Sequence, residues 1–249
     1  MAENAKPFAD KIALVTGASR GIGAALALHL AEAGAHVVAV ARTTGGLEEL
    51  DDKIQAAGGS ATLVPLDVKD SEGVARLALA LYERYQRLDV LIGNAGLLGP
   101  LSPLDHVEPK DWDNLFAVNV TANWQLIRCM DALLKRSSAG RAVFITSALS
   151  WLARAYCGPY AASKAALNEL VQTYATETDS SNVRVNLFSP GPTYTRLYRS
   201  GWPGVDPATL PTPEDVAPAI VPLCTADCTE NGKVYDFRKK KFLEFRPPV

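Results

Sequence analysis

The sequence predicts a single-domain α/β fold in which helices cover both faces of a doubly wound parallel sheet of about seven strands. Short apolar runs alternate with amphipathic segments, and most runs lack strict apolar–polar alternation, as strands covered on both faces do. Parallel neighbours need a crossover between them, and the intervening segments are long enough to form one. Strands are expected at residues 12–15, 36–40, 61–66, 88–92, 142–145, 183–188 and near 232, and helices near residues 21–33, 45–57, 70–86, 111–136, 158–178 and 213–226.

Composition and charge narrow the classes of partner. Of 249 residues, 48% are hydrophobic and 21% charged, which is ordinary for a globular protein. The net charge of -2 supplies no domain-scale basic field, so we expect neither a nucleic acid nor a membrane as partner. The basic run over residues 238–241 is interpreted as a solvated edge strand. Residues 1–10 lack the apolar core of a signal peptide, and no apolar stretch is long enough to span a bilayer, so a cytoplasmic protein is expected.

Cysteine and histidine spacing predicts no metal site. The three histidines lie at no metal-ligand spacing from another ligand type, and no two cysteines form a CxxC pair. We therefore expect free thiols in a reducing compartment. The four cysteines are Cys129, Cys157, Cys224 and Cys228.

A glycine-rich turn follows the first strand and opens an alanine-rich helix. Glycine lets the backbone turn sharply and approach a pyrophosphate without a Cβ in the way, and the helix N-terminus offers free N–H groups to the phosphates. A glycine triplet can be a simple strand-to-helix turn, but its place at the first βα junction favours a dinucleotide site. The candidate cofactor-binding residues here are Gly17, Ser19, Arg20, Gly21, Ile22 and Gly23.

The end of the second strand predicts which dinucleotide is bound. An acidic residue there would bind the ribose hydroxyls of NAD and repel a 2′-phosphate, but Ala41 and Arg42 occupy this place. Arg20 in the glycine turn could supply a second cation to the same phosphate. The alternative is that Arg42 only begins a surface loop. We expect NADP(H), with NAD(H) less favoured.

Two further strand ends contribute candidate cofactor contacts, because ligands of such folds lie beyond the carboxyl ends of the strands. Asp67 follows the third strand and could accept a hydrogen bond from the adenine amine. A glycine after the fourth strand allows close backbone approach. The candidates at these two ends are Asp67, Val68, Asn94, Ala95 and Gly96.

The reacting centre is predicted at Tyr160 and Lys164, which are four residues apart in an expected helix and so share a face. An ammonium beside a phenol favours the phenolate and is expected to lower the tyrosine pKa, which suits acid/base catalysis near neutral pH. Ser147, at the end of the fifth strand, could donate to a substrate oxygen that gains negative charge. Tyr235 and Lys239 have the same spacing, but in a strand-like segment residues four apart are too distant to couple.

At these residues the chain resembles the short-chain dehydrogenase/reductase family, from about Lys11 to Thr195, because five motifs occur in the family's order. The resemblance implies a Rossmann fold and an NADP-dependent carbonyl or 3-oxoacyl reductase type of member. It implies that Asn119 kinks the central helix and positions a water that links Lys164 to solvent. It also implies that the loop after the sixth strand holds the nicotinamide amide and phosphates through Pro190, Gly191, Thr193 and Thr195.

The chain departs from the family after this loop. Residues 193–212 leave room for only a short substrate lid, which implies an open cleft for a bulky or carrier-bound substrate. Residues 1–10 are expected to be an N-terminal extension, and 232–249 a C-terminal strand and tail whose unusual sequence makes a tetramer doubtful. Pairing through the helices near 111–136 and 158–178 is expected, in a homodimer or homotetramer. Candidate substrate-wall residues are Trp151, Leu152, Arg154 and Trp202.

Taken together, these features predict a reductase that passes hydride from NADPH to a ketone or 3-oxoacyl carbonyl, with Tyr160 as general acid and Asn119, Ser147 and Lys164 as its catalytic partners. Two alternatives remain open. One is an NAD-linked alcohol dehydrogenase of the same fold. The other is a regulatory protein that binds NADP without turnover.

Overall fold

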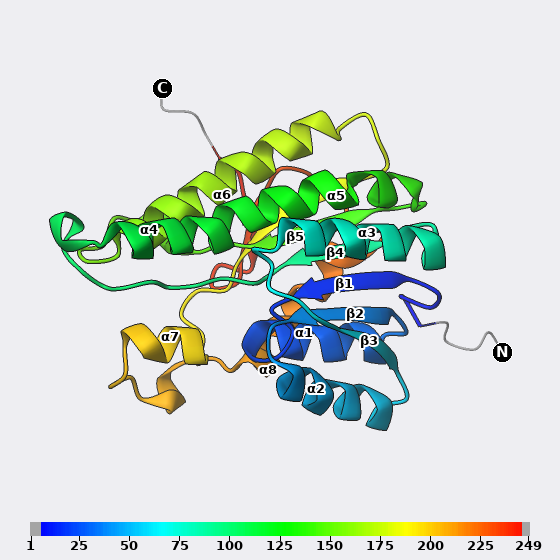
Figure 1. Ribbon diagram of the computed structural model, residues 1–249, viewed down its shortest axis with the longest axis horizontal. Helices are drawn as coiled ribbons and strands as arrows, with labels where there is room; N and C mark the ends of the chain where they lie inside the picture. Colours follow the sequence, from blue (N-terminus) through cyan, green and yellow to red (C-terminus); the bar gives the residue numbers. More distant parts are fainter. Residues whose placement is uncertain (1–5, 246–249) are drawn as a thin grey trace.

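The apolar runs of the sequence form the strands of one sheet in the computed structural model, which describes residues 6–245 (Figure 1). The sheet has eight strands in the order β3-β2-β1-β4-β5-β6-β7-β8, and every pair is parallel except the last. This confirms the expected doubly wound fold, with one strand more than expected. The strands are β1 Ile12–Thr16, β2 His36–Ala41, β3 Ser60–Pro65, β4 Val90–Gly93, β5 Arg141–Ile145, β6 Arg184–Ser189, β7 Val234–Asp236 and β8 Lys241–Leu243.

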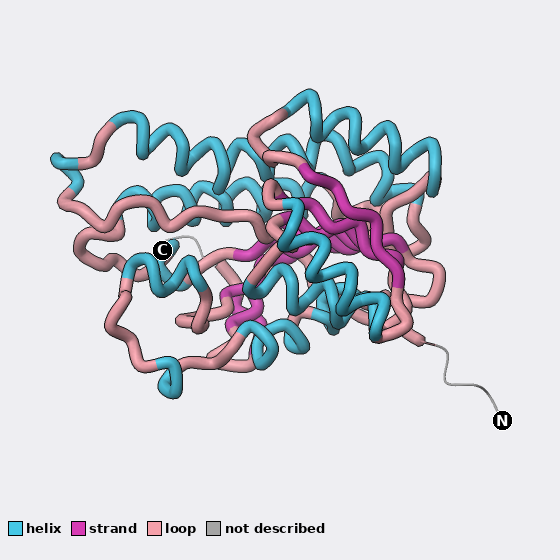
Figure 2. The backbone as a smooth tube through the Cα atoms, turned by 60° about the horizontal axis from the view of Figure 1, so that its bottom comes forward, coloured by secondary structure: helices cyan, strands magenta, loops and turns pink. Residues whose placement is uncertain are grey.

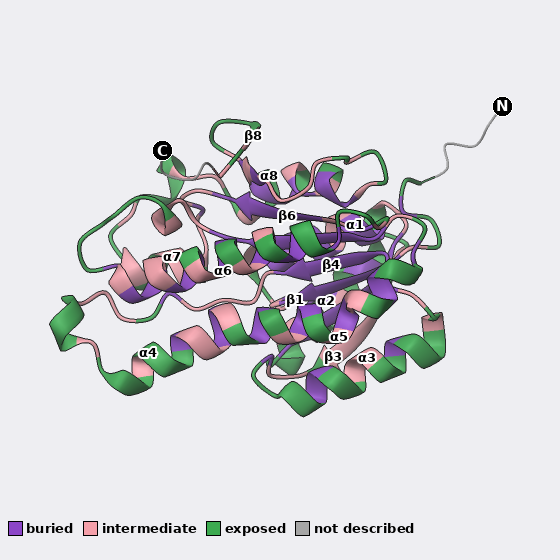
Figure 3. Cartoon of the chain, turned by 90° about the horizontal axis from the view of Figure 1, so that it is seen from above, coloured by how far each residue is buried: buried purple, intermediate pink, exposed green. Residues whose placement is uncertain are grey.

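Helices cover both faces of the twisted sheet, as Figures 1 and 2 show. One face carries α1 and α2 with α8 against α1, while α3, α5 and α6 cover the other. In Figure 3 the purple, buried sides of these helices face the sheet and the green sides face outward. Each face encloses its own apolar core, as the two-sided strand pattern requires. The helices are α1 Gly21–Glu32, α2 Thr44–Ala56, α3 Ser71–Tyr85, α4 Pro109–Phe116, α5 Ala122–Arg136, α6 Gly158–Glu177, α7 Arg196–Gly201 and α8 Pro213–Val216.

Two of the expected helices are wrong in detail. The expected helix over 213–226 stops at Val216 and continues as short 3₁₀ turns, because Pro218 and Pro222 lack the amide hydrogens that an α-helix needs. The expected helix over 111–136 is interrupted by a π-helical turn over Ala117–Thr121, which divides it into α4 and α5. Both differences reflect local breaks in helical hydrogen bonding.

The C-terminal segment forms a hairpin at the edge of the sheet. Its basic run over 238–241 occupies the turn after β7 and the first residue of β8, which pairs antiparallel with β7. The run was expected to be an edge strand, but most of it lies in the turn. Residues 1–5 of the expected N-terminal extension and 246–249 of the expected tail lie outside the described residues.

Within residues 6–245, no helix is both long and apolar enough to cross a bilayer. No group of three or more His, Cys, Asp or Glu side chains in that range is arranged to hold a metal ion. The four cysteines are free thiols.

Candidate active site

A cavity of about 700 Å³ opens at the carboxyl ends of the central strands. The strand order reverses at β1, which has β2 on one side and β4 on the other, and the crevice at such a reversal is where ligands of open α/β sheets bind. All the residues expected to bind the cofactor line this cavity except Gly23. Segments far apart in the sequence therefore converge on one site.

The glycine turn after β1 is held by the end of β4. The Asn94 side-chain nitrogen donates hydrogen bonds to the carbonyl oxygens of Thr16 (2.8 Å) and Gly17 (3.3 Å), while the Thr16 hydroxyl accepts from the backbone N–H of Asn94. Gly17 and Gly21 have φ values of +65° and +57°, in the left-handed region that favours glycine. A Cβ on Gly23 would lie 2.4 Å from the Asn94 amide nitrogen, so Gly23 serves close packing of the turn and lies outside the cavity.

Two arginines lie beside each other at the ends of β1 and β2. Both Arg20 and Arg42 are exposed and line the cavity, and Arg20 Nη2 lies 3.4 Å from the hydroxyl of Thr43. Neither arginine makes an ion pair within residues 6–245. Their guanidinium groups remain available to an anionic ligand.

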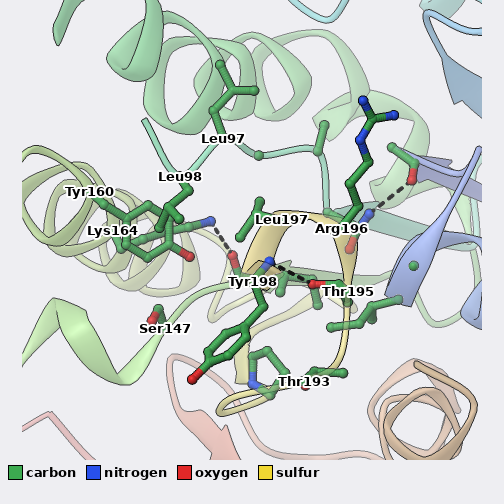
Figure 4. A pocket seen from close by; sticks show the side chains of 18 of the residues that line it. Leu97, Leu98, Ser147, Tyr160, Lys164, Thr193, Thr195, Arg196, Leu197 and Tyr198 are labelled. Carbon is green, nitrogen blue, oxygen red and sulfur yellow. Dashed lines mark hydrogen bonds between the residues drawn. The ribbon is translucent and has the colours of Figure 1, made fainter. Parts of the chain in front are cut away.

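Ser147, Tyr160 and Lys164 meet on the opposite side of the cavity (Figure 4). Ser147 follows β5 and caps a short 3₁₀ turn, where its hydroxyl oxygen accepts a 3.2 Å hydrogen bond from the Leu149 amide. Tyr160 and Lys164 lie on one face of α6, with the ammonium 5.9 Å from the phenol ring centroid. Lys164 Nζ donates a 2.7 Å hydrogen bond to the carbonyl of Ile145 at the end of β5.

Burial controls the pKa values of this pair. Removal of Tyr160 from water raises the pKa of its phenol to about 12, and the nearby Ser147 hydroxyl offsets this only in part. Burial lowers the pKa of Lys164 to about 8. The expected lowering of the tyrosine pKa is therefore wrong, because burial of the phenol is the largest cause of its shift and raises its pKa.

Asn119 lies at the centre of the π-helical turn and is fully buried. Its side-chain oxygen accepts from the Leu97 amide (2.8 Å), and its side-chain nitrogen donates to the Leu97 carbonyl (2.9 Å) and to Ser163 Oγ (3.0 Å). Asn119 thus joins the segment after β4 to α6 next to Tyr160. It does not line the cavity itself.

A hydrogen-bond chain behind Ser147 was not found from the sequence. Thr146 Oγ1 donates to Asn168 Oδ1 (2.5 Å), Asn168 Nδ2 donates to Ser150 Oγ (2.7 Å), and Ser150 Oγ donates to the Ser147 carbonyl (2.6 Å). Asn168 is buried on α6, four residues after Lys164, and that spacing could have indicated it. Through Ser150 it fixes the backbone that carries Ser147.

Three of the four expected substrate-wall residues line the cavity: Leu152, Arg154 and Trp202. Trp151 does not. It lies against Phe245, with ring centroids 6.2 Å apart, and lines a separate hollow beside β8. Trp151 and Leu152 are adjacent in the sequence, but they line different hollows.

Two further arginines line the cavity without having been expected there. Arg196 begins α7 directly after Thr195, and Arg238 reaches the cavity from the β7–β8 turn. A Cβ on Gly191 would lie 2.9 Å from Arg238 Cδ, so this side chain passes closely over the loop after β6. The sequence did not indicate Arg238, because it belongs to a basic run and only the β7–β8 hairpin brings this member of the run to the cavity.

The fold and these motifs define an oxidoreductase of the short-chain dehydrogenase/reductase family, to which this chain belongs: residues 11–204 match the short chain dehydrogenase family. YciK of Escherichia coli (strain K12), an uncharacterized oxidoreductase, is 36% identical over 231 residues that cover 91% of each chain. Dehydrogenase/reductase SDR family member 4 of Mus musculus is 31% identical over 90% of this chain and 84% of its own.

Solved structures agree with this assignment. A short chain dehydrogenase from Shigella flexneri 2a str. 301, complexed with NADP, has a TM-score of 0.89 and 34% identity, with 94% of this chain and 99% of that chain covered. One from Escherichia coli CFT073, complexed with NADPH, has a TM-score of 0.87 and 34% identity at the same coverage.

Proposed function

We propose that this protein is an NADPH-dependent reductase that converts a ketone or 3-oxoacyl carbonyl into a secondary alcohol, with Tyr160 as general acid. The observation that carries the proposal is that Ser147, Tyr160 and Lys164 line one wall of a cavity whose other side has the features of a dinucleotide site, with the Lys164 ammonium 5.9 Å from the phenol ring centroid.

The residues present fit a dinucleotide. The left-handed Gly17 and Gly21 leave space along the turn, where a Cβ on Gly21 would meet nothing closer than 3.5 Å. Helix α1 begins with no side-chain cap and no acidic residue in its first turn, so its N–H groups can bind phosphate. Arg20 and Arg42 supply cations for a 2′-phosphate, and two similar solved structures hold NADP or NADPH.

When bound, the cofactor supplies the hydride for the carbonyl carbon. Ser147 and Tyr160 donate hydrogen bonds to the carbonyl oxygen, where negative charge develops. Because burial raises the pKa of Tyr160 to about 12, its phenol is protonated at neutral pH and can give its proton to that oxygen. The Lys164 ammonium then stabilises the phenolate that remains. Asn119 is assigned the role of positioning a water that returns a proton through Lys164.

The test compares Tyr160→Phe with wild type and Tyr85→Phe. The first variant removes the proposed acid and should lower kcat by about 10²- to 10⁴-fold, the usual contribution of a positioned acid/base. The Tyr85 hydroxyl is buried without a hydrogen-bond partner and lies on α3, so the same chemical change there should leave turnover unaltered. Oxidation of NADPH is followed with a panel of ketones and 3-oxoacyl thioesters. Undiminished turnover in Tyr160→Phe would refute the assigned acid.

A further inference from the structure

The cavity is lined by more positive charge than is needed to bind a dinucleotide on one of its sides. One carboxylate lines the cavity, that of Asp67, and it lies 4.0 Å from the ammonium of Lys69. Arginines from five separate segments face the same space. They are Arg20, Arg42, Arg154, Arg196 and Arg238.

Four of these arginines lie on the side expected to hold the cofactor. Arg20 and Arg42 follow β1 and β2, and Arg238 passes over Gly191 in the loop after β6. Figure 4 shows Arg196 beside Thr195, across the cavity from Tyr160 and Lys164. Their charge is complementary to the phosphates of NADPH.

Arg154 is different, because it belongs to the segment that leads from Ser147 to Tyr160. Its guanidinium lies over the Trp202 ring, 4.8 Å from the centroid, and Trp202 stacks in turn on Tyr198 of α7 with centroids 4.7 Å apart. The side chain makes no hydrogen bond or ion pair among residues 6–245. Stacking covers a face of the guanidinium but leaves the N–H donors around its edge for a ligand.

Apolar side chains join the acid/base pair to this cation. Tyr160 is buried in a small apolar cluster with Leu98, and Leu149, Leu197 and Trp202 pack against that cluster. All of these line the cavity, so an apolar wall extends from the phenol to the ring beneath Arg154. A substrate whose carbonyl reaches Tyr160 would place an apolar chain on this wall and its far end near the guanidinium.

We propose that the substrate is a ketone that bears a carboxylate at the far end of an apolar spacer, and that Arg154 binds this carboxylate. A single planar guanidinium matches the two oxygens of a carboxylate, whereas a phosphate dianion would call for more cations than this wall holds. The inference rests on the proposed reductase function and specifies its substrate class.

The experiment measures kcat/KM with NADPH for a series of methyl-ketone carboxylic acids of increasing chain length and for their methyl esters. Wild type should prefer the acid to its ester at the best chain length. In Arg154→Met the acid-to-ester ratio should fall about tenfold, as expected for a charge-assisted hydrogen bond lost from a partly exposed site. Arg154→Lys should restore only part of the ratio, because an ammonium cannot bind both oxygens in one plane.

Arg199→Met is the matched control. Arg199 also lies over an aromatic ring of the lid, 5.2 Å from the Tyr194 centroid, but it does not line the cavity. The substitution removes the same charge and the same kind of stacking, so the acid-to-ester ratio should stay at the wild-type value. If both variants lowered the ratio equally, general electrostatics would explain the effect and the assignment to Arg154 would be wrong.

The remaining outcomes separate this inference from the proposed function. The carboxylate site is overturned if wild type reduces esters as well as acids, or if Arg154→Met lowers kcat/KM for acid and ester equally. The proposed reductase function stands in both cases. If no ketone turns over, calorimetry with the NADP⁺-loaded wild type still compares acid with ester. Equal or undetectable binding of the two then overturns the inference, whereas failure to bind NADPH at all overturns the proposed function.

Discussion

Replacement of Lys164 by Met should change how stability depends on pH. Burial lowers the pKa of this lysine from an ordinary 10.5 to about 8, which corresponds to about 3 kcal/mol of stability lost when the buried group carries its charge. Met keeps an unbranched side chain and removes the charge. It also leaves the Ile145 carbonyl without its donor, at a cost of about 1–3 kcal/mol that does not vary with pH.

The direction of the effect follows from the protons that each state binds. Below about pH 8 the lysine is protonated in both the folded and unfolded chains, so wild type carries the whole cost of the buried charge. Between pH 8 and 10.5 only the unfolded chain keeps its proton, so wild-type stability rises with pH. Wild type should therefore gain about 3 kcal/mol relative to Lys164→Met across this interval, and the two should be close to equal in stability near pH 7.

Urea unfolding of both proteins at several pH values measures this difference. Contributions of the other titratable groups to the pH dependence are the same in both proteins and cancel in the comparison. Lys233→Met is the control, because hydrogen bonds with Glu230 and Glu244 raise the pKa of that half-buried lysine. Its stabilisation is lost only above 10.5, so its curve should run parallel to wild type at lower pH. A parallel curve for Lys164→Met as well would show that Lys164 keeps an ordinary pKa and would refute the reasoning.

Two further predictions concern the cofactor and the support of Ser147. Arg42→Asp should lower the ratio of NADPH to NADH affinity by about tenfold or more, because a cation for the 2′-phosphate is replaced by a carboxylate that suits ribose hydroxyls; fluorescence titration measures it, and an unchanged ratio contradicts the role of Arg42. Asn168→Leu removes the donor to Ser150 and should lower kcat about tenfold with little change in KM, since misplacement of Ser147 weakens contacts at the reacting oxygen. A rise in KM alone would show that Asn168 acts on substrate binding instead.

Local sequence patterns are sufficient for much of the fold and for the cofactor side of the site. The strands are short apolar runs whose two-sided burial is visible in the sequence, and Gly17 and Gly21 take the left-handed conformation that makes glycine informative there. Because parallel strands end at one edge of the sheet, residues after successive strands could be assigned to one cavity before any coordinates were known.

The features that the sequence did not reveal depend on distant contacts. The hydrogen bonds from Asn119 to Leu97 that hold the π-helical turn cannot be inferred from helical periodicity, although the family resemblance led us to expect a kink at Asn119. Arg238 lines the cavity only because the β7–β8 hairpin turns it over Gly191. In contrast, the early end of α8 was open to prediction, since Pro218 and Pro222 break the helical hydrogen bonds.

The raised pKa of Tyr160 bears on the direction of the reaction. Oxidation of an alcohol would need the phenolate as a base, and a phenol with a pKa of about 12 is rarely ionised near neutral pH. Reduction starts from the neutral phenol and produces the phenolate in the last step. Because the pKa of Lys164 is about 8, this lysine is largely protonated at lower pH and lies beside the phenolate when it forms. In the proposed reduction, burial keeps the acid in its reactive neutral form, and kcat/KM for reduction should fall as the pH rises through 8, when the amine that stabilises the phenolate loses its charge.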